Sequence, residues 1–160
     1  MQNHNMAQAI GQALQQRKQW LALAESCTGG LIAKLVTDVA GSSAWFERGL
    51  VTYSNQAKHE LLSVPESLLI EHGAVSKACA LAMVAGLLRN SPADWGIAVT
   101  GVAGPGGGTP EKPVGTVWIA LLRRDGKSEA RHYQFDGDRE RVREHTAQAA
   151  LQWLQEKLAT

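Results

Sequence analysis

Short apolar runs alternate along this chain with segments whose apolar residues recur at helical spacing. Such alternation is typical of α/β folds, in which helices cover a sheet. The apolar run WLALAE at 20–25 predicts a buried strand. The segment TGGLIAKLVTDVAG at 28–41 predicts a helix, because Leu31, Leu35 and Val39 share one face. A strand therefore leads directly into a helix within the first quarter of the chain.

The same patterns continue to the end of the chain and predict about five strands and five or six helices. The last two strands flank Asp125-Gly126, a favoured turn pair, so they should form an antiparallel hairpin. A hairpin added to strands that are joined through helices makes the sheet mixed. The predicted strands are 20–25, 45–55 (ending near Tyr53), 94–101, 115–126 and 129–135, and the predicted helices are 5–17, 28–41, 56–62, 65–73, 76–90 and 138–158.

Size and charge narrow the class of protein. A chain of 160 residues with 44% hydrophobic residues is expected to form a single domain, residues 1–160, with a full core. A net charge of +1 argues against bulk attraction to nucleic acid or to a membrane surface. The two cysteines, Cys27 and Cys79, have no metal-ligand spacing and suit a reducing compartment. We therefore expect a cytoplasmic protein with no metal site and no nucleic-acid or membrane partner.

The densest set of reactive groups lies between the first strand and the helix that follows it, in the sequence ESCTGG. Ligands of open α/β sheets bind at the carboxyl ends of strands, and the free amides of a helix start favour an anion or an oxyanion. Ser26 could be a nucleophile at this corner, as in a strand-turn-helix elbow without its usual glycine signature. Alternatively, Ser26 or Thr28 is only a helix cap. The pattern alone leaves the two interpretations about even.

A possible base lies in YSNQAK at 53–58. A lysine with a lowered pKa can take the proton of a serine, and a tyrosine can relay a proton or orient the lysine. Lys58 would have to reach Ser26 across the fold, because no S-x-x-K motif puts both on one helix. By itself, Lys58 is more simply interpreted as a solvated helix lysine.

Two further segments could bind a phosphate. TGVAGPGGG at 100–108 follows a predicted strand, and glycines there allow close approach to an anion, although neither phosphate-loop signature is complete. It could equally be a flexible connector. Arg139 and Arg143 are four residues apart and could clamp a phosphate or carboxylate. Pairing with neighbouring glutamates on a solvated helix face is the simpler alternative.

Taken in order, these motifs closely resemble the CinA carboxy-terminal domain family, in particular its stand-alone amidohydrolases of nicotinamide mononucleotide. The resemblance covers about residues 5–158 and is carried by AESCTGG, GSSAWFERGLVTYSNQAK, GAVS, AVTGVAGPGGG, KPVGTVW and the later GDR. It implies a three-layer α/β/α sandwich with a mixed, roughly five-stranded sheet, and a homo-oligomer. It also implies hydrolysis of the carboxamide of nicotinamide mononucleotide to nicotinate mononucleotide and ammonia, in pyridine nucleotide recycling.

The resemblance places the catalytic residues at Ser26, Tyr53 and Lys58. On this basis we expect neutral Lys58 to take the proton of Ser26, Tyr53 to position or relay, and Cys27 to be a neighbour of the nucleophile. Glu25 would bond the ribose or orient Lys58, and this choice stays open. The residues expected to bind substrate or its oxyanion are Glu25, Thr28, Gly29, Gly30, Thr100, Gly101, Gly104, Gly106, Gly107 and Arg139.

This chemistry requires no cofactor. Two alternatives stay open at this point: a non-catalytic nucleotide-binding module, in line with the competence and damage link in the family's name, and an amidohydrolase with a different substrate.

Overall fold

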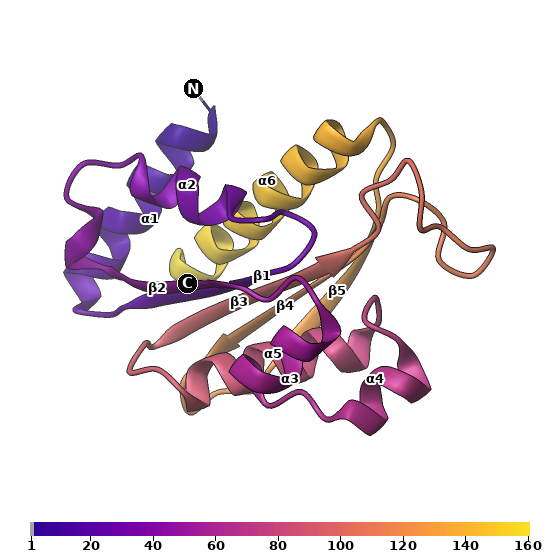
Figure 1. The fold of residues 1–160 in the computed structure, drawn as a ribbon. Helices are drawn as coiled ribbons and strands as arrows, with labels where there is room; N and C mark the ends of the chain where they lie inside the picture. The colour runs from indigo at the N-terminus through magenta and orange to yellow at the C-terminus, as the bar shows by residue number, and fades with distance from the viewer. Residues whose placement is uncertain (1) are drawn as a thin grey trace.

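The computed structural model describes residues 2–160, which form a five-stranded sheet with helices on both of its faces (Figure 1). The helices are α1 (Gln2–Arg17), α2 (Leu31–Thr37), α3 (Asn55–Leu62), α4 (Glu66–His72), α5 (Lys77–Arg89) and α6 (Arg139–Leu158), with a 3-10 helix η1 (Ser42–Ala44). The strands are β1 (Leu21–Glu25), β2 (Phe46–Val51), β3 (Trp95–Gly101), β4 (Thr116–Arg123) and β5 (Glu129–Gln134).

The strand order β2-β1-β3-β4-β5 divides the sheet into a parallel and an antiparallel half. β1 pairs in parallel with both β2 and β3, whereas β3, β4 and β5 pair antiparallel in succession. The predicted mixed sheet and its closing hairpin are confirmed. Because β1, β2 and β3 run the same way, the segments that follow them meet at one edge of the sheet. These three segments carry ESCTGG, YSNQAK and the glycine loop.

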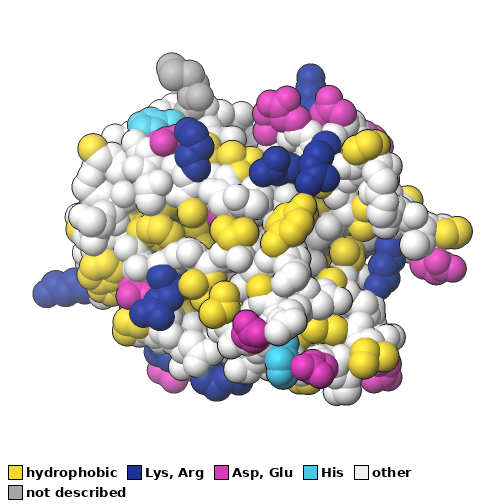
Figure 2. Space-filling model, in the orientation of Figure 1, with side chains coloured by type: hydrophobic (Ala, Val, Ile, Leu, Met, Phe, Trp, Pro, Cys, Tyr) yellow, Lys and Arg dark blue, Asp and Glu magenta, His cyan; other side chains and the backbone are white. Residues whose placement is uncertain are grey.

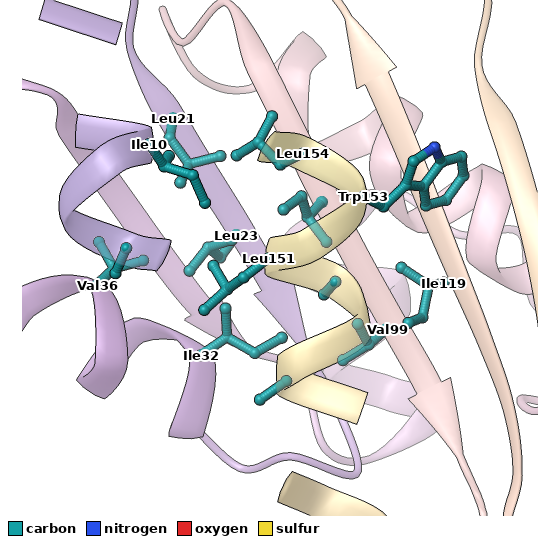
Figure 3. Packing of buried hydrophobic residues seen from close by; sticks show 14 of the residues in the cluster. Ile10, Leu21, Leu23, Ile32, Val36, Val99, Ile119, Leu151, Trp153 and Leu154 are labelled. Atoms are coloured by element: carbon teal, nitrogen blue, oxygen red, sulfur yellow. The ribbon is translucent and has the colours of Figure 1, made fainter. Parts of the chain in front are cut away.

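Two separate hydrophobic clusters lie on the two faces of the sheet, which confirms the predicted three layers. α1, α2 and α6 cover one face and α3, α4 and α5 cover the other, as Figure 1 shows. Figure 3 shows the first cluster, in which Leu21 and Leu23 of β1 meet Ile10, Ile32 and Leu154 of the covering helices.

The second face of the sheet carries small side chains. The alternate residues Ala22, Ala24, Ala98 and Ala120 all point into the second cluster. Within that layer α5 also lies very close to the end of α3, since a methyl group on Gly86 would lie 1.7 Å from the Leu62 carbonyl oxygen. This close packing fixes α3, and with it the lysine that α3 carries.

The helix after β1 begins later than its sequence pattern predicts. Thr28 is not the N-cap, because Gly29 and Gly30 both have positive φ values, 59° and 104°, and the chain turns before α2 begins at Leu31. Residues 26–30 therefore form a tight connection between strand and helix.

β2 likewise ends at Val51, two residues before Tyr53.

Along the described residues, no helix is both long enough and apolar enough to cross a membrane.

Candidate active site

A cavity of about 300 Å³ opens where the carboxyl ends of β1, β2 and β3 meet. Within residues 2–160 no carboxylate lines it, and its basic side chains are those of Lys58 and Arg139. Such a lining favours an anionic ligand. The lining residues are Ser26, Cys27, Tyr53, Asn55, Lys58, Ala74, Val75, Thr100, Gly101, Val102, Ala103, Gly104, Gly106, Gly107 and Arg139.

Ser26 and Lys58 meet in this cavity, although they are 32 residues apart in the sequence. Lys58 Nζ lies 3.0 Å from Ser26 Oγ, and it also contacts the carbonyl oxygens of Thr52 at 2.9 Å and Tyr53 at 3.0 Å. The lysine side chain is almost fully buried, at 1% exposure. It projects from the first turn of α3, whose start is capped by the Ser54 hydroxyl. The predicted serine and lysine are therefore brought together.

The surroundings of Lys58 favour a neutral amine. Burial lowers the pKa of its ammonium group, because the charged form loses more hydration than the neutral amine. None of the ion pairs among the described residues includes Lys58. A neutral amine that donates its two hydrogens to the two carbonyls keeps its lone pair for the Ser26 hydroxyl. This geometry suits a general base.

Cys27 lines the cavity as a neutral thiol. Burial raises its pKa to about 12, so almost no thiolate exists near neutral pH. A methyl group on Gly101 would lie 3.2 Å from the Cys27 sulfur, which shows how closely the thiol packs against β3. The environment of Cys27 therefore favours attack by Ser26.

Tyr53 contacts Lys58 through its main chain and not through its ring. The side chain is 58% exposed, and its hydroxyl accepts a hydrogen bond from Arg139 Nη2 at 3.0 Å. A proton relay would need this hydroxyl beside Ser26 or Lys58, and the structure directs it to Arg139 instead. The Tyr53 carbonyl oxygen accepts a hydrogen bond from Lys58 Nζ at 3.0 Å.

Arg139 joins two sides of the cavity mouth. Besides Tyr53, its guanidinium donates to the Gly104 carbonyl oxygen at 2.8 Å, across to the glycine loop. Figure 2 shows basic side chains next to hydrophobic ones on this face of the molecule. The predicted clamp with Arg143 is not formed, because Arg143 donates to the Thr28 carbonyl oxygen at 3.0 Å and does not line the cavity.

The glycine loop contributes Gly101, Gly104, Gly106 and Gly107, which were expected to bind substrate, to the cavity wall. Gly104 and Gly107 have positive φ values of 86° and 85°. The loop therefore takes a path that side chains would strain.

Thr100 lines the same wall, but its hydroxyl is already used. It donates to the Ala74 carbonyl oxygen at 2.9 Å and so ties β3 to the GAVS segment.

The predicted roles of Glu25 are corrected by the structure. Its carboxylate, 1% exposed, accepts hydrogen bonds from the Thr28 hydroxyl and from the amides of Gly30, Ile32 and Ala33. It contacts neither Lys58 nor the cavity, so it neither orients the lysine nor reaches a ribose.

The predicted oxyanion hole at Thr28–Gly30 is also corrected. The Gly29 amide donates to the Ser26 carbonyl oxygen and the Gly30 amide to Glu25, and neither these residues nor Thr28 lines the cavity. The amides of Gly29 and Gly30, the two residues with positive φ values, are therefore used in local bonds.

Besides Cys27, five lining residues were not among the expected site residues: Asn55, Ala74, Val75, Val102 and Ala103. All five lie in motifs already singled out from the sequence, since Asn55 lies in YSNQAK, Ala74 and Val75 lie in GAVS, and Val102 and Ala103 lie in the glycine loop. Within residues 2–160, no three His, Cys, Asp or Glu side chains gather as metal ligands.

Comparison of the sequence and comparison of the structure both find relatives of the CinA C-terminal domain. The model of the CinA C-terminal domain matches residues 3–158. Nicotinamide-nucleotide amidohydrolase PncC of Enterobacter agglomerans is 54% identical, over 93% of this chain and 91% of its own length. The protein of that name from Escherichia coli K12 is 49% identical, over 93% and 90%.

Among solved structures, the competence/damage inducible protein CihA of Agrobacterium tumefaciens superposes with a TM-score of 0.96 at 42% identity, covering 100% of this chain and 97% of the other. This chain belongs to the CinA C-terminal domain family.

Proposed function

We propose that this chain is a nicotinamide-nucleotide amidohydrolase that converts nicotinamide mononucleotide and water to nicotinate mononucleotide and ammonia. The observation that carries the proposal is the 3.0 Å contact between Ser26 Oγ and the buried Lys58 Nζ inside a ligand-sized cavity. The two relatives at 54% and 49% identity, both called nicotinamide-nucleotide amidohydrolase, support the choice of substrate.

In the first half-reaction, Lys58 takes the hydroxyl proton of Ser26 while Oγ attacks the carboxamide carbon. The tetrahedral intermediate carries its negative charge on the former carbonyl oxygen. In nucleophile elbows, the amide of the residue after the nucleophile donates to this oxygen. That residue is Cys27 here, and we assign its amide as an oxyanion donor. The carbon–nitrogen bond then breaks, and ammonia leaves with the proton that Lys58 returns.

In the second half-reaction, Lys58 takes a proton from water, and the resulting hydroxide attacks the Ser26 ester. The carbon–oxygen bond to Ser26 breaks, and the lysine returns the proton to Oγ. Nicotinate mononucleotide forms as a carboxylic acid, passes its remaining proton to water or to the released ammonia, and leaves as a carboxylate. Both halves use the same pair, so the chemistry needs no cofactor.

The phosphate of the substrate is assigned to the glycine-loop side of the cavity. Arg139 supplies a positive charge there. The amides of Ala103, Gly104 and Gly106 donate to no protein acceptor within residues 2–160. Free amides at a glycine-rich turn beside a guanidinium are a suitable site for a phosphate. Action as a homo-oligomer in the cytoplasm, within pyridine nucleotide recycling, stays a prediction from the family resemblance.

The test is ammonia release from nicotinamide mononucleotide by wild type, Ser26→Ala, Lys58→Ala and Cys27→Ala. We expect the first two variants to lose about 1,000-fold or more in kcat, as removal of a nucleophile or its base does in comparable enzymes. Cys27→Ala should keep most of the activity. A folded and fully active Ser26→Ala beside an inactive Cys27→Ala would contradict the assignment of the nucleophile.

A second measurement separates the alternatives. Thermal stabilisation by nicotinamide mononucleotide without ammonia release would favour a binding module, whereas release only from other carboxamides would favour a different substrate.

A further inference from the structure

The carboxylate of Glu25 lies next to the nucleophile in the sequence, but it faces away from the cavity. Glu25 ends β1 and its two oxygens receive four donors. The distances are 2.6 Å from the Thr28 hydroxyl, 3.3 Å from the Gly30 amide, and 3.0 Å from each of the amides of Ile32 and Ala33. In the described part of the chain no ion pair includes Glu25. Its charge is therefore matched by the start of α2.

α2 depends on this carboxylate because its own start provides no cap. The N-cap position is Gly30, which has no side chain and a φ of 104°. The first amides of a helix lack partners within the helix, and a negative charge near them is stabilising. Glu25 supplies, from five residues before the N-cap, the acceptor that a serine or aspartate cap would otherwise supply.

The result is a closed turn around Ser26. Glu25 is tied to Gly30 on the far side of the turn, and the Thr28 hydroxyl is tied to the same carboxylate oxygen. The Gly29 amide donates to the Ser26 carbonyl oxygen at 3.0 Å. Ser26 therefore lies in a turn that starts at Glu25 and ends at Gly30, and the Glu25 carboxylate joins these two ends.

The other member of the catalytic pair is held without the Glu25 carboxylate, although the Glu25 main-chain carbonyl accepts a hydrogen bond from the Thr52 amide at 2.8 Å. Lys58 is fixed by the carbonyl groups of Thr52 and Tyr53 and by its place in α3. Only the Ser26 side of the 3.0 Å contact depends on the carboxylate of Glu25, and Glu25→Gln leaves the main-chain bond to Thr52 in place. A displacement of about 1 Å between reacting groups can reduce a rate about 100-fold.

We propose that Glu25 is a positioning residue whose carboxylate, acting through the first turn of α2, holds Ser26 Oγ in line with Lys58. The proposal rests on Ser26 as the proposed nucleophile, but it does not require nicotinamide mononucleotide to be the substrate.

Glu25→Gln tests it, because the amide keeps the shape but replaces one acceptor oxygen by a donor that meets a backbone N–H. We expect kcat for nicotinamide mononucleotide to fall about 100-fold with little change in KM, since the cavity lining is untouched. The second readout is the rate at which a fluorophosphonate probe labels Ser26, followed by intact mass, which should fall by a similar factor. Both rates are expressed per folded molecule, with the folded fraction taken from circular dichroism.

Val36→Ala is the matched control. Val36 is a buried residue of α2 outside the turn, so its truncation weakens the same helix without touching Glu25. It should lower the melting temperature and leave both rates per folded molecule unchanged.

A folded Glu25→Gln that reacts with the probe at the wild-type rate overturns the proposal, and so does a loss confined to KM. If wild type is labelled but releases no ammonia, the proposed function fails, while slower labelling of Glu25→Gln still supports the positioning role. Should Glu25→Gln not fold, Thr28→Val decides, because it removes only the hydroxyl bond to Glu25. Labelling about tenfold slower is expected from the loss of one charge-assisted hydrogen bond, and an unchanged rate overturns the proposal.

Discussion

At the scale of single residues, the reactivity of Ser26 depends on the charge of Lys58. The ammonium form would donate to Oγ, whereas the neutral amine can accept its proton. Three contacts and near-complete burial fix the amine, and burial is also what lowers its pKa. One side chain environment therefore provides both the position and the basicity that the reaction needs.

This environment predicts the pH dependence of the reaction. Because only neutral Lys58 can act as the base, kcat/KM should rise with pH through the lysine pKa and level off above it. Burial places the midpoint of this rise below 10.5, the ordinary value for lysine. A pH–rate profile with nicotinamide mononucleotide measures the midpoint, and a midpoint at or above the ordinary value would argue against a desolvated base.

At the scale of helices and strands, the place of Lys58 depends on the packing of α3 against α5. Gly86→Ala should destabilise the protein by about 3 kcal/mol or more, because its new methyl group meets the Leu62 carbonyl oxygen at 1.7 Å and backbone must move. Urea denaturation measures the change in the free energy of unfolding. Gly106→Ala is the stability control, since a methyl group there meets no atom within 4 Å. Equal stability of the two variants would contradict this account of the packing.

The elements themselves were largely predictable from the sequence, because period-two and helical spacing of apolar residues are local signals. The contact between Ser26 and Lys58 was not, since it depends on the register of β1 with β2 and on the packing of α3, both of which are long-range. Only resemblance to a known family pointed to it beforehand. The role of Glu25 was missed because the positive φ values of Gly29 and Gly30 shift the helix start by several residues.

At the scale of the whole molecule, ligand binding should stabilise the fold. Nicotinate mononucleotide, the proposed product, should raise the free energy of unfolding by about 2.7 kcal/mol at 100 times its Kd, as linkage requires. The riboside, which lacks the phosphate, should stabilise much less at the same concentration. Thermal denaturation with each ligand measures the difference.

Arg139→Gln is the matched variant for this measurement, because it removes the charge at the cavity mouth. It should reduce the advantage of the mononucleotide over the riboside. Equal stabilisation by both ligands in wild type would show that the phosphate is bound elsewhere or not at all.

The sheet separates the two hydrophobic clusters, and the catalytic pair is divided between them. The connection that carries Ser26 continues into α2 and the first cluster, where Cys27 packs, whereas α3 anchors Lys58 to the second cluster through Leu62. Loss of either layer separates the serine from its base, even while the other layer stays folded. A folding intermediate that retains only one layer should therefore have no enzymatic activity. Activity should appear only when both layers are folded.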